Sequence, residues 1–450
     1  MKKSNRKRLI FGFTIVILLL TIILIIMFNQ KPNSIEEIEV VPSKEKIKEE
    51  PKQEEPQKEE TKKEVKEENI TKYTEKYEHD IVIKDKNIKY ESNVNDATKL
   101  EINDFLIEFY DLYFNILKSL EYQDVSYLFS NKENAAIYKT SLELLIETRK
   151  NNSNDLKIIN PKYELTLKKY SEKDDVISFT ILENCSYNFN FIKEYTTSVY
   201  NIENEFKLKK DEDGKYKITF FKKVQDFYVM VTDLYKSTEN YEEALTKIKS
   251  DYEKKFKTEN SKIENMKNNY LSGNYKLLKA DHEYDRGKSY LYATNWVGRR
   301  NTKKWHTYNA NCVNFVSQVM YAGGIPMDHY GSEQWKWYST SKNTKNEPKG
   351  FVYSWTYVPS ITSYFSKNTG FGLVGKYDEN LYLGDVGDVI VVGTKGPTRH
   401  VVSVISQIKD SNGKVIDLLV SSNTVDLIYF PLSAYAYPYK VLMKVYGYND

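Results

Sequence analysis

After about residue 76, a helical pattern of apolar residues is followed by a strand-like pattern, and the two predict an α+β domain over residues 76–238. Apolar residues recur mostly every three or four positions from about Asp96 to Ser130, and "NAAIYKTSLELLIETRK" continues this pattern, which predicts helices. The four segments "KYELTLKKY", "DVISFTIL", "SVYNIENEFKLKK" and "KYKITFFKKV" then show the alternating or β-rich composition of strands, separated by turn residues. Helices followed by an antiparallel sheet are typical of an α+β domain.

Residues 285–450 also show helical segments followed by β-rich runs. "DRGKSYLYATNWVGRR" predicts a helix, and "NANCVNFVSQVMYAGGIP" predicts another that starts at Cys312 and carries Val316, Val319 and Met320 on one face. Three β-rich runs follow: "GDVGDVIVVG", "RHVVSVISQI" and "VIDLLVSSNTVD". We therefore expect a helix with a cysteine at its start to precede an antiparallel sheet.

The segment between these domains, residues 239–284, is polar and helical in pattern. Its apolar positions are sparse and do not form a sustained heptad repeat. The pattern favours a solvated helical connector over a dimerising coiled coil.

The N-terminus predicts a membrane anchor. The uncharged, mostly apolar run from Leu9 to Phe28 would span about 30 Å as a helix, enough to cross a bilayer. A secretory signal peptide would have a shorter apolar region that ends in small residues, whereas this run ends in Met27-Phe28-Asn29-Gln30. Basic residues fill the cytoplasmic segment 1–8, so we expect the remainder to lie outside the cell membrane as the body of a single-pass protein.

Residues 29–75 predict a disordered tether. The segment is dominated by Lys, Glu, Gln and Pro, and it cannot bury enough apolar surface to offset the entropy of ordering. A solvated single helix would be interrupted by Pro51 and Pro56. Fully extended, the tether could reach on the order of 100 Å, which suits a layer beyond the membrane.

Composition narrows the candidate chemistry. A net charge of +3 is too small to indicate a nucleic-acid partner. No His-Glu-x-x-His or paired Cys-x-x-Cys motif is present, so we expect neither a metal nor another cofactor. The two cysteines of an exported chain could form a disulfide, but Cys185 and Cys312 fall in different predicted domains. Cys185 lies in a strand-like run and is typical of a small buried hydrophobic residue, whereas Cys312 could be a functional thiol.

Cys312 and His400 form the candidate catalytic pair. The start of a helix stabilises a thiolate, and a nearby histidine can accept the thiol proton. Of the five histidines, only His400 begins a predicted strand, which is a rigid platform for a base. Taken alone, a cysteine at a helix start or a histidine in a strand could equally be a packing residue.

Asn423 is the candidate third catalytic residue. The turn residues Asn412-Gly413 predict a hairpin, and pairing Ser411 with Lys414 would place His400 diagonal to Asn423 on one face. A three-residue loop would instead shift the pairing by one residue, and Asn423 would then lie on the opposite face of the sheet from His400. Two aromatic residues, Trp335 and Trp337, could line a substrate site or belong to the core.

Residues 285–450 resemble the putative amidase domain family, a group related to papain-like thiol hydrolases such as NlpC/P60 and CHAP. The resemblance rests on "YDRGKSYLYATNWV", "NANCVNFVSQVMYAGGIPMD", "GDVGDVIVV" and "RHVVSVIS". It implies that Cys312 is the nucleophile, that His400 is the base and that Asp388 is structural. The family commonly has Asp where Asn311 stands and His-Thr where Asn423-Thr424 stand. Asparagine is an accepted third member in papain-like enzymes. The order of elements in 76–238 resembles cone-shaped domains of the nuclear-transport-factor-2-like type.

Two functional hypotheses follow. The first is a membrane-anchored extracytoplasmic cysteine hydrolase that cleaves an amide bond in the cell envelope, with peptidoglycan or another envelope peptide as its substrate. The second is a non-catalytic envelope-binding or scaffold protein whose hydrolase domain is degenerate. In either case the domain at 76–238 shows no catalytic constellation, and we expect it to be a spacer or to bind a ligand or a protein partner.

Overall fold

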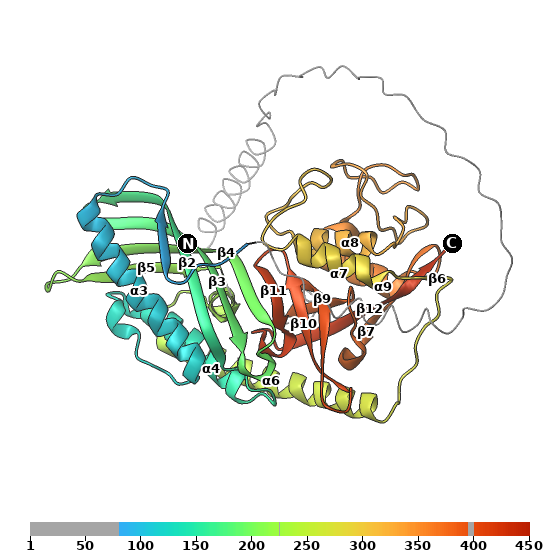
Figure 1. Cartoon of the computed structure of the whole chain (residues 1–450), viewed down its shortest axis with the longest axis horizontal. Helices are drawn as coiled ribbons and strands as arrows, with labels where there is room; N and C mark the ends of the chain where they lie inside the picture. Colours follow the sequence, from blue (N-terminus) through green and yellow to red (C-terminus); the bar gives the residue numbers. More distant parts are fainter. Residues whose placement is uncertain (1–80, 225, 395–399) are drawn as a thin grey trace, which may run out of the picture. The chain divides into compact units, whose positions relative to one another are not determined.

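The computed structural model describes residues 81–224, 226–394 and 400–450, and a mixed twelve-stranded sheet runs through this part of the chain (Figure 1). The predicted α+β fold is confirmed at this level. The predicted anchor at 9–28 and tether at 29–75 lie outside the described residues. Within the described ranges, no helix is both long enough and apolar enough to span a bilayer.

The first half of the sheet is covered by helices on one face. Its elements in chain order are β1 (Asn87–Tyr90), α3 (Asp96–Ser119), α4 (Lys132–Lys150), β2 (Ile158–Lys173), β3 (Val176–Phe189), β4 (Thr196–Lys210), β5 (Tyr216–Lys223) and α5 (Asp226–Leu234). Phe109 of α3 packs edge-on against Phe206 of β4 at a centroid distance of 5.4 Å and contacts Phe221 of β5 at 5.3 Å. These aromatic rings form the core between the helices and the sheet.

Helix α3 is shorter than its apolar pattern predicts. The side chain of Asn95 accepts a hydrogen bond from the backbone N–H of Thr98 and caps its start. The helix ends at Ser119 because Leu120 adopts a left-handed conformation, with φ of 55°. The expected continuation to Ser130 is therefore wrong, and a short 3₁₀ turn, Ser126–Leu128, replaces its last part.

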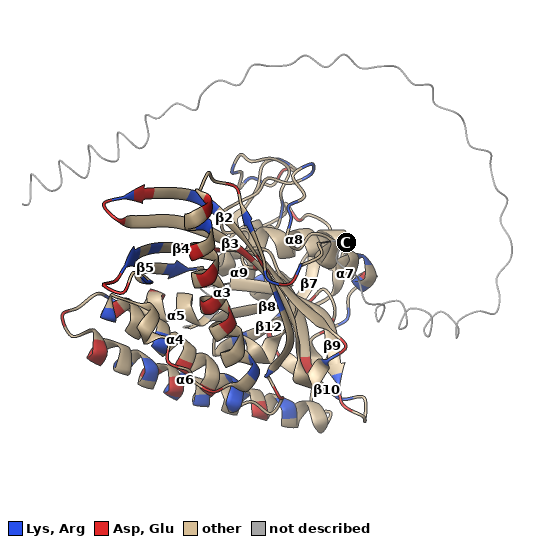
Figure 2. Ribbon diagram, turned by 60° about the vertical axis from the view of Figure 1, so that its left-hand side comes forward, with Lys and Arg blue, Asp and Glu red and all other residues tan. Residues whose placement is uncertain are grey.

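Helix α6 (Tyr241–Leu271) joins the two halves and contacts both of them. Basic and acidic residues follow one another along its ribbon (Figure 2). However, Tyr252 is buried, and its hydroxyl lies 3.2 Å from Thr148 Oγ1 of α4 and donates to the carbonyl of Ala436 at 2.7 Å. The predicted helix is present, and among its residues only Leu245 and Tyr252 are buried.

The second half places helices beside the remaining strands. Its elements are β6 (His282–Glu283), α7 (Arg286–Asn295), α8 (Cys312–Ala322), α9 (Val358–Lys367), β7 (Gly372–Glu379), β8 (Val389–Gly393), β9 (His400–Lys409), β10 (Val415–Ser422), β11 (Asp426–Pro431) and β12 (Tyr439–Asn449). Strands β8, β9, β10 and β11 are sequential antiparallel neighbours. This arrangement confirms a cysteine helix followed by an antiparallel sheet.

Strand β4 of the first half pairs with β11 of the second, and this pairing makes the sheet continuous. Val199 lies opposite Leu427 in an antiparallel register, and the Thr197 hydroxyl donates to the carbonyl of Tyr429 at 2.7 Å. Because β11 directly follows the end of β10, this pairing supports the segment that approaches Cys312.

Candidate active site

Cys312 is the first residue of α8, and its thiol is largely buried. Only 6% of the residue is exposed, and Val316, Val319 and Met320 anchor the helix beneath it in the core. Burial raises the pKa of the Cys312 thiol above its ordinary value. Hydrogen bonds from the backbone N–H groups of Val401 and Val313 oppose this effect. The N–H groups at the helix start thus lower the pKa of the Cys312 thiol, as expected, but the effect of burial is larger.

His400 stands at the start of β9, beside the residue that contacts the thiol. Helix α8 packs against β9, and Val401, which lowers the pKa of the Cys312 thiol, follows His400 directly in sequence. On the neighbouring strand, the hydroxyl of Ser422 lies 2.7 Å from Nε2 of His400. The fold therefore brings the start of α8, the start of β9 and the end of β10 together.

Asn423 contacts the loop before the cysteine helix instead of the histidine. Its Oδ1 accepts a hydrogen bond from Nδ2 of Asn311 at 2.6 Å, and its Nδ2 donates to the carbonyls of Trp296 and Arg299 at 2.9 and 3.1 Å. The side chain is almost completely buried. The expectation that Asn423 orients His400 does not match these contacts, because its amide positions the residue that precedes the nucleophile.

The loop between β9 and β10 explains part of this difference. The N–H of Asp410 donates to the carbonyl of Lys414 at 2.8 Å, and the N–H of Gly413 donates back to the carbonyl of Asp410 at 3.0 Å. The loop therefore contains three residues, and Gly413 supplies the positive φ of 74° that closes it.

Two irregularities in the β9–β10 ladder then set the register at His400. The first, between Val415 and Asp417, restores the predicted pairing, but the second, between Leu419 and Val420, shifts it again by one residue. Ser421 consequently pairs with Ser403. A one-residue slip exchanges the two faces of a strand, so Ser422 and not Asn423 becomes the diagonal neighbour of His400.

Ser422 and Thr424 are site residues that the sequence analysis did not identify. The Thr424 hydroxyl accepts a hydrogen bond from the backbone N–H of Asn311 at 2.8 Å and also interacts with the Cys312 thiol, whose pKa it lowers. The signal in the sequence was the run Ser421-Ser422-Asn423-Thr424 at the end of an apolar strand. Periodicity alone could not show which of these side chains faces the histidine.

Comparison with known proteins found a family match in the C-terminal part of the chain. Residues 283–446 match the putative amidase domain family. The chain is also 29% identical over 144 residues to the uncharacterized protein YhbB of Bacillus subtilis (strain 168), a match that covers 32% of this chain and 42% of that protein. A crystal structure of a putative aromatic ring hydroxylase from Novosphingobium aromaticivorans is 13% identical and covers 30% of this chain and 99% of that chain. Its TM-score is 0.19, so it carries no argument here.

Trp335 belongs to the core of the amidase domain. Its indole is completely buried, donates through Nε1 to Ser317 Oγ at 3.1 Å and packs on Trp355 at a centroid distance of 4.5 Å. A substrate-lining role for Trp335 is therefore wrong, because its ring fills the space next to α8. Trp337 is partly exposed and packs edge-on against Trp305 at 5.5 Å.

Asp388 of the amidase domain is a buried structural carboxylate. It pairs with Arg286 at 3.0 Å and with Lys444 at 3.1 Å, and it accepts a hydrogen bond from the backbone N–H of Val445. These contacts join the start of α7 to β12. Among the residues described, no three His, Cys, Asp or Glu side chains are grouped so that they could hold a metal ion.

Cys185 lies away from this chemistry. It is buried in β3, where it pairs with Tyr163 and Val199 on the neighbouring strands. Both cysteines are free thiols, so the structure does not contain the alternative disulfide between Cys185 and Cys312. The prediction that Cys185 is a small buried residue is confirmed.

Proposed function

We propose that the chain is a cysteine hydrolase that cleaves an amide bond, with Cys312 as the nucleophile and His400 as the base. The observation that carries the proposal is the packing of α8, which starts at Cys312, against β9, which starts at His400, with the Ser422 hydroxyl 2.7 Å from Nε2 of His400. The family match of residues 283–446 supports the same reaction class.

In this mechanism the thiol starts neutral, because burial raises its pKa. As Sγ of Cys312 attacks the amide carbonyl, its proton passes to His400, and the negative charge moves to the carbonyl oxygen. We assign Nδ1 as the ring nitrogen that takes the proton, with Nε2 donating to the Ser422 hydroxyl. The backbone N–H of Cys312, at the start of α8, is a donor for the oxyanion.

Collapse of the tetrahedral intermediate breaks the C–N bond. His400 then gives its proton to the leaving amine, and the acyl group remains on Sγ as a thioester. A water molecule, deprotonated by His400, attacks this thioester and releases a carboxylic acid and the free thiol. Asn423 and Thr424 act on this cycle indirectly, since both bind Asn311, the residue before the nucleophile.

The proposed substrate is an amide of the cell envelope, most directly a peptide bond of peptidoglycan. This part of the proposal rests on the apolar run 9–28, its basic flank and the polar segment 29–75, which would hold the body outside the membrane. External protease should then remove the body from intact, wall-stripped cells. Survival of the full-length chain under that treatment would contradict the proposed location.

A second candidate function is that of a binding protein without catalysis. One observation favours it: Cys312 is only 6% exposed, and its pKa is raised. A degenerate amidase domain could still bind envelope peptides, and the domain at 76–238 could bind a partner.

The two functions are separated by incubating the full-length chain, in detergent, with purified peptidoglycan and analysing released fragments by mass spectrometry. Hydrolysis predicts new fragments that disappear in Cys312→Ala and persist in Cys185→Ala. Sedimentation of the protein with peptidoglycan, without any released fragment, would support the binding function instead.

A further inference from the structure

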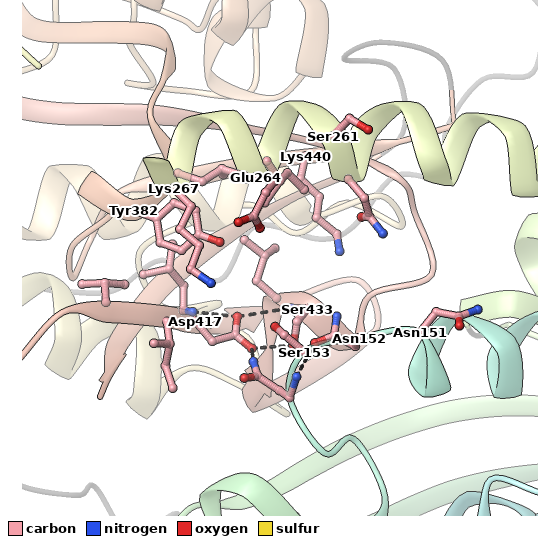
Figure 3. Close-up of a pocket in the computed structure, with 18 residues that line it drawn as sticks. Asn151, Asn152, Ser153, Ser261, Glu264, Lys267, Tyr382, Asp417, Ser433 and Lys440 are labelled. Carbon is pink, nitrogen blue, oxygen red and sulfur yellow. Dashed lines mark hydrogen bonds between the residues drawn. The ribbon is translucent and has the colours of Figure 1, made fainter. Parts of the chain in front are cut away.

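A pocket with a cavity volume of about 420 Å³ lies between α6 and the sheet, separate from the active-site residues (Figure 3). Its walls come from the loop Asn151–Asn154 after α4, from one side of α6 that includes Glu264 and Lys267, and from strand residues that include Asp417 and Lys440. A volume of this size is typical of small-ligand sites, which often form where separate structural units meet.

The floor of the pocket is organised by Asp417. This carboxylate is buried and accepts hydrogen bonds from Asn154 Nδ2 at 3.2 Å, from the Ser433 hydroxyl and from the backbone N–H of Leu418 at 2.8 Å. These contacts join the loop after α4 to β10 and to the residues after β11. The polar groups of the floor are therefore held in place before any ligand enters.

The wall formed by α6 carries two charged side chains, Lys267 and Glu264. Neither makes a hydrogen bond or ion pair with any residue that the structure describes, although they are three positions apart on the same helix. The labelled side chains of Glu264 and Lys267 extend from α6 on the side of the pocket (Figure 3). Lys440 of β12 also lines the pocket, and its charge acts on the buried carboxylate of Asp417. The wall formed by α6 thus offers one amine and one carboxylate at the same time.

Asparagine side chains supply neutral hydrogen-bonding groups. The side-chain amides of Asn151 and Asn260 make no hydrogen bonds with the described residues, and each can both donate and accept. A peptide group has the same combination of one donor and one acceptor. Leu381 and Tyr382 add apolar surface beside them.

We propose that this pocket binds a short peptide with a free amine and a free carboxylate. Lys267 matches the ligand carboxylate, Glu264 matches its amine, and the asparagine amides match its peptide groups. Inorganic phosphate fits less well because Glu264 and Asp417 would repel a dianion. A neutral glycan would leave the charges of Lys267 and Glu264 without a partner. The site goes beyond the proposed hydrolase and does not depend on its activity.

Isothermal titration calorimetry of full-length Cys312→Ala in detergent tests this proposal. The probes are trialanine with free termini, N-acetyl-trialanine amide, inorganic phosphate and a tetramer of N-acetylglucosamine. We expect trialanine to bind, and its blocked form to bind at least about 10-fold more weakly because both charge contacts are lost. The Cys312→Ala background prevents turnover, so this result is independent of hydrolysis.

Variants of α6 locate the binding. Lys267→Ala and Glu264→Gln should each weaken trialanine binding by about 10-fold. Lys262→Ala is the matched control, because Lys262 lies on the same helix but pairs with Glu259 at 2.7 Å and does not line the pocket. The proposal is overturned if trialanine does not bind, if the blocked peptide, phosphate or the glycan binds as tightly, or if Lys262→Ala has the same effect as Lys267→Ala.

Discussion

The imidazole of His400 is joined through Nε2 to the hydroxyl of Ser422, 2.7 Å away on the neighbouring strand. Such a contact fixes the orientation of the ring and determines which nitrogen exchanges the proton. Because Ser422 ends β10 and His400 begins β9, the geometry of the proposed base depends on the register of these two strands.

Replacing Ser422 by Ala should lower the rate of amide hydrolysis by roughly 10- to 100-fold, the scale expected for loss of an orienting contact. Ser421→Ala is the matched control. Ser421 is equally buried, but its hydroxyl has no hydrogen-bond partner among the described residues, so its removal should leave the rate near wild type. Equal rates for the two variants would argue against an orienting role for Ser422.

Asn423→Ala should instead reduce stability. The substitution leaves the buried Nδ2 group of Asn311 and the carbonyls of Trp296 and Arg299 without their partner. Each buried group left unsatisfied costs about 1–3 kcal/mol. Urea denaturation should show a lower midpoint for Asn423→Ala and little change for Ser422→Ala. An unchanged midpoint for Asn423→Ala would show that this network does not stabilise the loop before Cys312.

The comparison of sequence and structure is most informative at this site. Apolar periodicity located the helix that starts at Cys312, but the structure buries every residue from Cys312 to Met320 and not only one stripe. It could not choose between Ser422 and Asn423, because that choice depends on a three-residue loop and two irregularities in the ladder. The apolar periodicity could also not predict the pairing of β4 with β11, because this pairing joins segments that are more than 200 residues apart in sequence. Local periodicity carries no information on such contacts.

The first half of the chain contains a buried ion pair whose disruption should be costly. Lys223 and Glu183 lie 3.0 Å apart with side chains 6% and 0% exposed. Lys223→Met would leave Glu183 buried without its partner and should destabilise the protein by about 3–5 kcal/mol. Lys222→Met removes an exposed pair with Glu205 and should cost less than about 1 kcal/mol. Similar denaturation midpoints for both variants would contradict this account.

The reactivity of Cys312 should depend on pH in a way that reports its burial. Since burial raises the thiol pKa above 9.0, the thiolate population of His400→Ala should still be increasing above that pH. At a pH between the unfolded and the folded pKa, the Cys312 thiol of the native state retains a proton that the unfolded chain has released. The stability from the neutral thiol is therefore complete below the unfolded pKa and is lost as pH rises through the folded pKa. Stopped-flow alkylation of His400→Ala between pH 7 and 11 measures the thiolate population of Cys312 as a function of pH. A midpoint below 9 would contradict the raised pKa.

The pairing of Cys312 with His400 is tested most directly by alkylation of the two cysteines in the folded, full-length protein at pH 7. Iodoacetamide labelling, followed by mass spectrometry of peptides, gives separate rates for Cys312 and for Cys185, a buried thiol that serves as an internal control. We predict that Cys312 reacts faster than Cys185 and that His400→Ala slows Cys312 by at least about 10-fold, because the base no longer accepts its proton. Equal rates for the two cysteines, or a Cys312 rate unaffected by His400→Ala, would contradict the proposed nucleophile and base.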